Sequence, residues 1–280
     1  MFFSGISDEA GKPIETQIKA HKELGWKHME IRNVDGANLT LMDDAKFDEV
    51  YGKVNDAEIK VSCFAGCIAN WSRPITGDFQ VDIDELKNAI PRMKKFGTKF
   101  IRIMSWPNDN DNPVTETEWK KKAIERLKKL SKIAEDGEVI MVHENCNGWA
   151  GESPDNSLKM LSEVNSPSLK LVFDTGNTVF HGQDAMYFYS KIKEHIAYVH
   201  IKDAIFLPTG ITQTTYCGEG HAYVREILQN LKDNGYKGGT SIEPHLSAAV
   251  HLGEEATSEK AYKTYVTYGR KLIEIVNNLK

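Results

Sequence analysis

The alternation of short apolar runs with longer amphipathic stretches constrains this chain more than any other feature. Each apolar run is short and continuous, as expected of a parallel strand that is buried on both faces. Eight such runs lie at 2–6, 27–32, 59–65, 98–105, 138–144, 169–174, 196–201 and 239–243. Helical stretches lie between and after them, near 13–24, 41–55, 82–96, 115–135, 155–164, 184–194, 221–234 and 256–278. This order predicts parallel strands joined by right-handed crossovers.

A single (β/α)8 TIM barrel over residues 1–280 closes such an α/β chain most economically. The length is normal for one barrel, and no linker or low-complexity tract divides the chain. An open doubly wound sheet is the alternative. It is disfavoured because SGISDEAG, after the first strand, contains neither GxGxxG nor GxxxxGK[ST].

Charge and composition narrow the classes of partner. The net charge of −5 argues against a nucleic-acid surface or an anionic membrane surface. No apolar run is long enough for a membrane span, and MFFSGISDEA lacks the basic and apolar regions of a signal peptide. We therefore expect a cytoplasmic protein whose four cysteines are reduced.

Four potential metal ligands occupy the ends of the fifth to eighth strands. They are Glu144, Asp174, His200 and Glu243, one in each successive strand–helix unit. The carboxyl ends of barrel strands meet at one face, so these side chains are predicted to converge. Without a cation, three converging carboxylates would repel one another, and at least one would be protonated.

Each of these residues also has a simpler interpretation. A strand-end carboxylate is often a helix N-cap, and a single strand histidine is often part of the core. The recurrence of the pattern in four consecutive units favours one divalent metal ion. Oxygen-rich ligation with one imidazole suits Mn²⁺ best, with Mg²⁺, Co²⁺ or a catalytic Zn²⁺ as alternatives.

Several segments carry a resemblance to a known family. They are HENCNGWAG, LVFDTGN, HIKD, CGEG and SIEPH, with ISDEAG near the start and KELGWKHMEIR around the second strand. In these segments the chain resembles the sugar phosphate isomerase/epimerase superfamily, the xylose isomerase-like TIM barrels, over essentially its whole length. The resemblance implies that Glu144, Asp174, His200 and Glu243 form the family's metal site.

The resemblance also implies proton transfer next to a carbonyl. A bound cation polarises the carbonyl and a neighbouring hydroxyl oxygen and acidifies the C–H bond between them. In the ketose 3-epimerases of this superfamily, the two metal-bound glutamates are the acid–base pair, which corresponds here to Glu144 and Glu243. Asn147 matches their pattern, whereas Asn177 and Phe206 replace a histidine and an arginine. These two departures weaken the interpretation as a free-ketose 3-epimerase.

We therefore expect an isomerase or epimerase of a sugar, keto-sugar or sugar phosphate. A lyase or dehydratase, for example on 3-keto-glycosides, is the alternative, because β-elimination uses the same activated C–H bond. An AP endonuclease-like enzyme would need a histidine-rich zinc site and a basic groove, and a non-catalytic sugar-binding barrel is the last alternative. The expected partner is a small carbohydrate, and a homo-oligomer or a partner subunit stays open.

Lys202 is a candidate substrate-binding residue. It shares a strand face with His200, because residues i and i+2 point the same way, and could reach a substrate oxygen or phosphate. The alternative is a lysine that pairs with Asp203 or Glu219. Asp203 itself points the other way and is expected to act in a loop or a helix cap.

Arg102 and Trp106 share a face of the fourth strand by the same alternation. Arg102 is a candidate substrate contact. Trp106 is either a wall on which a sugar stacks or a tryptophan of the core or a lid. On the second strand Glu30 and Arg32 also share a face, and we expect them to form an internal ion pair.

The roles of His143 and of the loop after the seventh strand each have two interpretations. His143, beside Glu144, should face the helical layer as a buried histidine, but at a strand end it could instead act as a general base. Residues 204–220 are predicted to form a lid or a subunit contact. The CGEG segment, with Arg225 in the next helix, either binds an anion through backbone N–H groups or forms an ordinary turn.

Overall fold

The barrel strands form one parallel sheet that closes into a ring. The computed structural model describes residues 1–280 except 247, 250–253 and 256–257. Within this described part, eight strands pair in the order β1-β12-β9-β8-β7-β6-β5-β2, all in parallel. A parallel bridge between Ile6 and Glu30 closes the ring beside β1 and β2. The predicted (β/α)8 barrel is confirmed.

The strand bounds agree with the predicted runs to within two residues, except that β7 continues to Gly148. The strands are β1 (Phe2–Gly5), β2 (His28–Ile31), β5 (Lys60–Ala65), β6 (Phe100–Ser105), β7 (Ile140–Gly148), β8 (Leu169–Asp174), β9 (Ile196–Ile201) and β12 (Gly239–Ile242).

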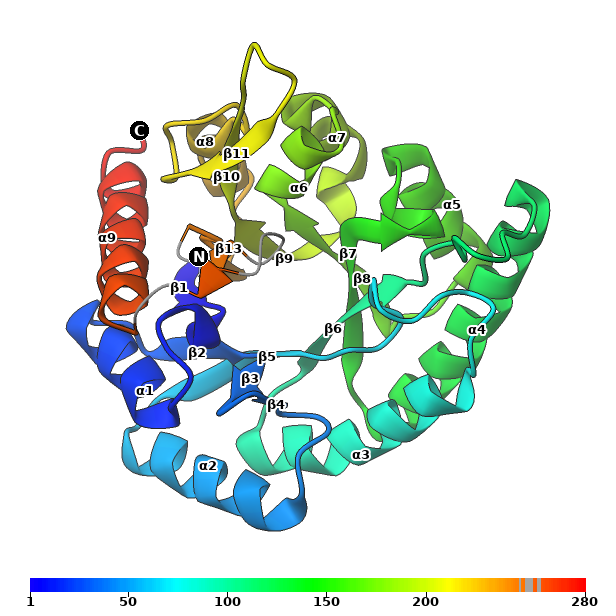
Figure 1. Ribbon diagram of the computed structural model, residues 1–280, viewed down its shortest axis with the longest axis horizontal. Helices are drawn as coiled ribbons and strands as arrows, with labels where there is room; N and C mark the ends of the chain where they lie inside the picture. Colours follow the sequence, from blue (N-terminus) through cyan, green and yellow to red (C-terminus); the bar gives the residue numbers. More distant parts are fainter. Residues whose placement is uncertain (247, 250–253, 256–257) are drawn as a thin grey trace.

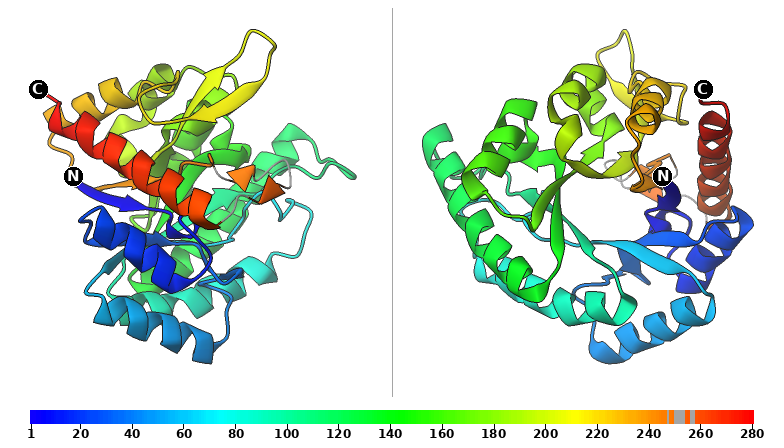
Figure 2. Two further views of the ribbon diagram at one scale, coloured as in Figure 1. Left: turned by 60° about the vertical axis from the view of Figure 1, so that its left-hand side comes forward. Right: turned by 180° about the vertical axis from the view of Figure 1, so that it is seen from behind.

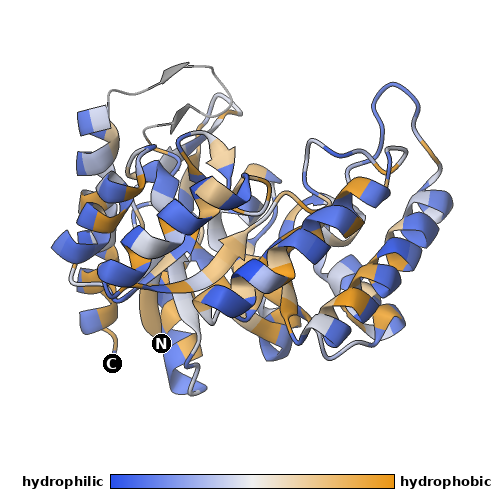
Figure 3. Ribbon diagram, turned by 90° about the horizontal axis from the view of Figure 1, so that it is seen from below, coloured by the Kyte–Doolittle hydropathy of each residue, from blue (hydrophilic) through white to orange (hydrophobic). Residues whose placement is uncertain are grey.

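The helices surround the strands, as Figure 1 shows. In Figure 3 they carry hydrophobic stripes beside hydrophilic ones, the pattern of a helix with one buried face. Residues 256–257, where the last helix was predicted to start, lie outside the described residues. The predicted helices correspond to α1 (Ile14–Glu23), α2 (Asp44–Asp56), α3 (Gln80–Phe96), α4 (Glu116–Gly137), α5 (Pro154–Val164), α7 (Ala185–Ile192), α8 (Val224–Asp233) and α9 (Ser258–Asn277).

The loops after the strands contain several short helices and strands. The helix α6 (Thr175–Phe180) follows β8 directly, and η1 (Ser7–Glu9) is a turn of 3-10 helix after β1. These elements are too short to show a period in the sequence. The strands β10 (Asp203–Phe206) and β11 (Thr212–Thr215) form an antiparallel hairpin in the predicted seventh loop, which extends away from the barrel in Figure 2. Two smaller antiparallel pairs are β3 (Asn33–Val34) with β4 (Ala37–Asn38), and β13 (Ala248–Ala249) with β14 (Glu254–Glu255).

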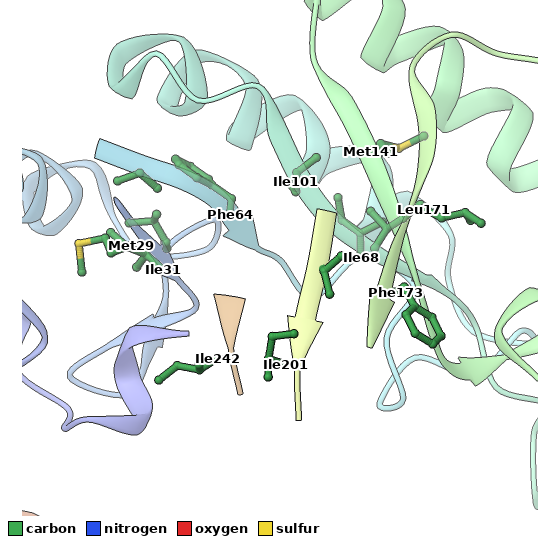
Figure 4. Packing of buried hydrophobic residues seen from close by; sticks show 14 of the residues in the cluster. Met29, Ile31, Phe64, Ile68, Ile101, Met141, Leu171, Phe173, Ile201 and Ile242 are labelled. Atoms are coloured by element: carbon green, nitrogen blue, oxygen red, sulfur yellow. The ribbon is translucent and has the colours of Figure 1, made fainter. Parts of the chain in front are cut away.

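The hydrophobic core has two layers. A large cluster lies between strands and helices, and Figure 4 shows members such as Met29, Phe64 and Met141. A smaller cluster of Cys63, Val142, Val172 and Tyr198 is separate from it. The last three each stand two residues before a predicted metal ligand. Strand alternation therefore puts the ligands on the same inward face as this cluster, nearer the carboxyl ends of the strands.

Two observations bear on the compositional expectations. All four cysteines are free thiols in the structure. Among the described residues, no helix combines the length and the apolar character that crossing a bilayer requires.

Candidate metal centre

The four predicted ligands meet inside the carboxyl end of the barrel. One ligand atom from each of Glu144, Asp174, His200 and Glu243 lies within 4.8 Å of the others, and all four residues are buried. Register explains the convergence, since Asp174 on β8 pairs with His200 on β9. Next to them, Ser241 on β12 also pairs with His200, and Glu243 follows it by two residues.

Asp174 combines the two roles that the sequence left open. Its Oδ1 accepts a hydrogen bond of 2.7 Å from the backbone N–H of Asn177, so it is the N-cap of α6. Its Oδ2 is buried and faces the other ligands. Asn145 fixes the backbone, because it accepts from Asp174 N at 2.7 Å and donates to Asp174 O at 2.8 Å. Burial raises the pKa of Asp174 to about 7; the charge of Lys202 opposes this rise, and nearby carboxylates add to it.

Glu144 is held at both oxygens. Arg102 Nη1 donates to its Oε2 at 3.0 Å, and Asn177 Nδ2 donates to its Oε1 at 3.0 Å. Arg102 is itself fixed by a 2.9 Å bond from Nη2 to the carbonyl of Gly66. Burial alone would raise the pKa of Glu144, but the interactions with His200 and Arg102 outweigh it and lower the pKa to about 2.

Lys202 reaches into the centre instead of pairing with Asp203 or Glu219. Its Nζ lies 3.0 Å from Asp174 Oδ2 and 2.9 Å from Glu243 Oε2, and it donates to Asn177 Oδ1 at 3.0 Å. The residue is 4% exposed. Burial would lower its pKa, but Asp174 and Glu243 raise it, so Lys202 is a buried ammonium group.

A second group of charges lies around the outer oxygen of Glu243. Arg32 Nη1 is 3.3 Å from Glu243 Oε1, and Arg32 also pairs with Asp8 and Glu9. His245 Nε2 is 3.2 Å from the same Glu243 oxygen. Glu9, Glu243 and His245 are close enough to hold an ion, but Arg32 already contacts both carboxylates, and we assign no second cation there. The predicted pair between Glu30 and Arg32 is wrong, because Arg32 turns to these acids and Glu30 to His200.

The donor set fits a divalent cation. His200 Nδ1, Asp174 Oδ2 and Glu243 Oε2 are all buried and face one another, and the two carboxylate oxygens share the single ammonium of Lys202. Such groups are costly to bury unless something compensates them. Lys202 supplies part of the compensation, and one imidazole with three carboxylates matches the preferences of Mn²⁺, Mg²⁺, Co²⁺ or catalytic Zn²⁺.

Of the predicted substrate-binding residues, the structure brings Arg102, Asn177 and Lys202 into contact with the ligand set and leaves two outside it. Asn147 is exposed at the end of β7, and its role stays a prediction. Trp106 is fully buried, and its Nε1 donates to Asp82 Oδ2 at 2.7 Å. This burial matches the core tryptophan better than the sugar-stacking wall, and the stacking role stays a prediction. The physical reason for the burial is its positive φ of 54°, which ends the strand alternation and turns the ring into the helical layer.

His143 lies on the opposite side of β7 from Glu144, as alternation requires. It is fully buried, and neither ring nitrogen forms a hydrogen bond among the described residues. Burial lowers its pKa to about 4, against a small opposing effect of Glu144. Its catalytic role is untested, but this geometry matches the buried histidine better than the general base.

The backbone of the CGEG segment binds a carboxylate of the same chain, that of Asp203. The N–H groups of Gly218 and Gly220 donate to Asp203 Oδ2 at 2.8 and 3.0 Å, and Ala222 N donates to Oδ1 at 3.1 Å. Asp203 thus has the loop role that the sequence predicted. These donors are already used, which disfavours a phosphate site at this turn.

Sequence reasoning missed Glu30, Asn145 and His245. His245 was visible in SIEPH, two residues after a ligand. Glu30 was expected to pair with Arg32, because its actual partner, His200, comes 170 residues later.

The xylose isomerase-like TIM barrel family matches residues 18–267. The chain belongs to this family. Inosose dehydratase from Bacillus anthracis (strain CDC 684 / NRRL 3495) is 34% identical over 164 residues, which are 53% of this chain and 54% of that protein. Inosose dehydratase from Clostridium beijerinckii is 26% identical over 149 residues, 48% of this chain and 50% of that one. The chain thus spans about half the length of the curated relatives it matches.

Solved structures of the family superpose along nearly the whole chain. The IOLI protein with a bound zinc atom has a TM-score of 0.78 at 18% identity and covers 100% of this chain and 99% of its own. A xylose isomerase-like TIM barrel protein from Mycobacterium smegmatis in complex with magnesium has a TM-score of 0.68 at 17% identity, covering 99% and 97%. D-Psicose 3-epimerase with D-tagatose from Clostridium cellulolyticum H10 has a TM-score of 0.75 at 14% identity, covering 100% and 99%. At these identities the likeness establishes the fold.

Proposed function

We propose that the protein is a divalent-metal-dependent dehydratase of a keto-polyol or keto-sugar, which removes a proton next to the carbonyl and then expels a hydroxyl group. The observation that carries the proposal is the set of four buried ligand atoms within 4.8 Å, with the ammonium of Lys202 beside them. The relatives named inosose dehydratases support the lyase outcome over the isomerase outcome that the sequence favoured.

Glu144, Asp174, His200 and Glu243 would hold the cation, for which we propose Mn²⁺ first. When bound, it supplies a Lewis acid that polarises the substrate carbonyl and acidifies the neighbouring C–H bond.

We assign the proton abstraction to Glu243. Both oxygens of Glu144 accept hydrogen bonds from buried donors, which hold it rigidly. Glu243 Oε2 contacts the ammonium of Lys202 at 2.9 Å, a group that can exchange a proton with it. A carboxylate placed this way can take a proton from carbon.

We assign the protonation of the departing hydroxyl to Lys202. As the C–O bond breaks, its ammonium hydrogen-bonds the leaving oxygen and gives it a proton, which releases water. Lys202 Nζ and Glu243 Oε2 are 2.9 Å apart, so the proton taken from carbon can return to the amine. The substrate then loses one water in total, and both side chains regain their starting states.

An isomerase or epimerase is the second candidate. Glu144 on β7 and Glu243 after β12 are separated by β8 and β9 in the ring. Two carboxylates from strands three positions apart in the ring suit removal of a proton from one face of a carbon and its return to the other. A substrate without a leaving group beside the acidic C–H bond would follow this course.

Product analysis separates the two candidates. The Mn²⁺-loaded protein is incubated in D₂O with a cyclic inosose, free ketoses, their phosphates and a 3-keto-glycoside, and products are examined by mass spectrometry and NMR. Loss of water from a keto-polyol supports the dehydratase, and a deuterated epimer supports the second candidate. No elimination and no exchange with any of these compounds would overturn the proposal.

A variant tests the base. Glu243→Gln should lower turnover by about 10²–10⁴-fold, the usual worth of a general base. Glu125→Gln, an exposed position on α4, is the matched control and should leave turnover unchanged. Full activity in Glu243→Gln would remove Glu243 from the mechanism.

A further inference from the structure

We infer that Glu30 positions His200 so that the imidazole binds the metal through Nδ1, an inference that rests on the proposed metal centre. Glu30 lies outside the four-ligand set, and it acts on that set only through the ring of His200.

The contact between the two residues crosses the interior of the barrel. His200 Nε2 lies 3.2 Å from Oε1 and 3.1 Å from Oε2 of Glu30, and both side chains are completely buried. Their strands, β2 and β9, are not neighbours, because β1 and β12 stand between them in the ring. The pairing therefore needs the side chains themselves to meet inside the closed ring.

The other ring nitrogen faces the metal ligands. His200 Nδ1 is 3.5 Å from Glu144 Oε1 and 3.7 Å from Glu243 Oε2, and it has no hydrogen bond. A neutral imidazole carries one N–H donor and one lone pair. A carboxylate at Nε2 keeps the proton on that nitrogen and leaves the Nδ1 lone pair for a cation.

The backbone of β2 is built to present Glu30 inward. The register between β2 and β5 shifts between Met29 and Glu30, and such an irregularity re-aims the side chains beside it. Met29 belongs to the layer between strands and helices. Glu30 turns to His200, and its backbone forms the bridge to Ile6 that closes the ring.

A purely structural buried carboxylate would be expected to pair with a permanent cation. Glu85 is such a case, since it is 2% exposed and its Oε2 lies 2.6 Å from Arg73 Nη2. Glu30 is equally buried but is directed at a histidine whose second nitrogen points at three carboxylates. A carboxylate, a histidine and a cation in line is the arrangement that orients metal-bound histidines.

Metal binding by the full chain tests the inference, with MnCl₂ alone as the probe in isothermal titration calorimetry. Glu30→Gln keeps the shape of the side chain and should weaken Mn²⁺ binding by about 10–100-fold, the usual effect of losing such a partner. Glu85→Gln is the matched control, since it alters an equally buried carboxylate away from the centre, and should leave the Mn²⁺ affinity of the folded protein unchanged.

The outcomes separate this inference from the proposed function. Failure of the unaltered protein to bind Mn²⁺ would overturn the metal centre and the inference with it. Tight binding by the unaltered protein and equally tight binding by Glu30→Gln would overturn the inference alone. Nitrogen NMR of the His200 ring in the Mg²⁺- or Zn²⁺-loaded protein gives a test without any variant. A proton on Nε2 is expected there, and a proton on Nδ1 would refute the assignment.

Discussion

Replacing Lys202 with methionine should destabilise the metal-free protein and make its stability depend strongly on metal. The substitution removes the ammonium that lies 3.0 Å from Asp174 and 2.9 Å from Glu243, while it keeps most of the side-chain volume. Both carboxylates stay buried. They then repel each other without the ammonium beside them, and Arg32, His200 and His245 are left to offset the repulsion.

The size of the effect follows from these contacts. At an effective dielectric constant near 20, unit charges 3 Å apart attract by about 5 kcal/mol. Removal of one partner from a buried pair costs about 3–5 kcal/mol in unfolding free energy. A domain of this size loses about 2–4 °C of melting temperature for each kcal/mol, so the expected drop is on the order of 10 °C.

Thermal unfolding by calorimetry measures the effect, first in EDTA and then with Mn²⁺. The cation stabilises the folded state by about 2.7 kcal/mol when its concentration is 100 times its dissociation constant. In Lys202→Met the stabilisation at equal Mn²⁺ should be larger, because Asp174 and Glu243 are left for the metal alone. Lys53→Met is the matched control: Lys53 also contacts two carboxylates, Glu15 and Glu49, but at the surface. Exposed pairs contribute little, so the control should melt close to the unaltered protein.

Two results would refute this reasoning. One is an unchanged melting temperature of Lys202→Met in EDTA, which would mean that the ammonium does not stabilise the buried acids. The other is a drop in melting temperature of the expected size in EDTA that Mn²⁺ fails to reverse. That result would mean that the carboxylates do not form a cation site.

Two further predictions concern residues outside the centre. Because burial holds the pKa of His143 near 4, below its ordinary 6.5, the unfolded chain takes up this proton first as the pH falls. The stability linked to His143, at most about 3 kcal/mol, is therefore present above pH 6.5 and lost toward pH 4. In urea unfolding, the free energy of unfolding of His143→Leu should fall less between pH 6.5 and pH 4 than that of the unaltered protein. Equal losses would contradict the lowered pKa of His143. Trp106→Phe leaves the Asp82 oxygen without its 2.7 Å donor, so it should cost about 1–3 kcal/mol in urea unfolding and leave KM unchanged. A raised KM would return Trp106 to the substrate site.

The positions of the strands and of the ligands could be predicted because both follow from short-range periodicity. Continuous apolar runs identified the parallel strands, and each ligand is placed where such a run ends. The parallel register then brings those ends together, as the pairing of Asp174 with His200 shows. The four ligands needed no knowledge of longer-range contacts.

The partners of these residues could not be predicted because they depend on local irregularities and on contacts across the ring. Alternation placed Glu30 beside Arg32, but each finds its partner on a distant element. Alternation also placed Trp106 inside the barrel, and a single positive φ reversed that placement. Lys202 was placed on the correct face, but its contact with the ligands required the positions of two other strand ends.

The two guanidinium groups at the centre come from the half of the chain that does not supply its carboxylate ligands. The carboxylates Glu144, Asp174 and Glu243 all belong to the second half, whereas two of the guanidinium groups that contact them, Arg32 and Arg102, belong to the first. During synthesis the half that carries both guanidinium groups emerges first, so these partners are made before the acidic ligands. A second half-barrel without the first would contain these carboxylates but lack Arg32 and Arg102. The same charges that prepare a cation site therefore make correct assembly of the two half-barrels favourable and penalise a ring that closes out of register.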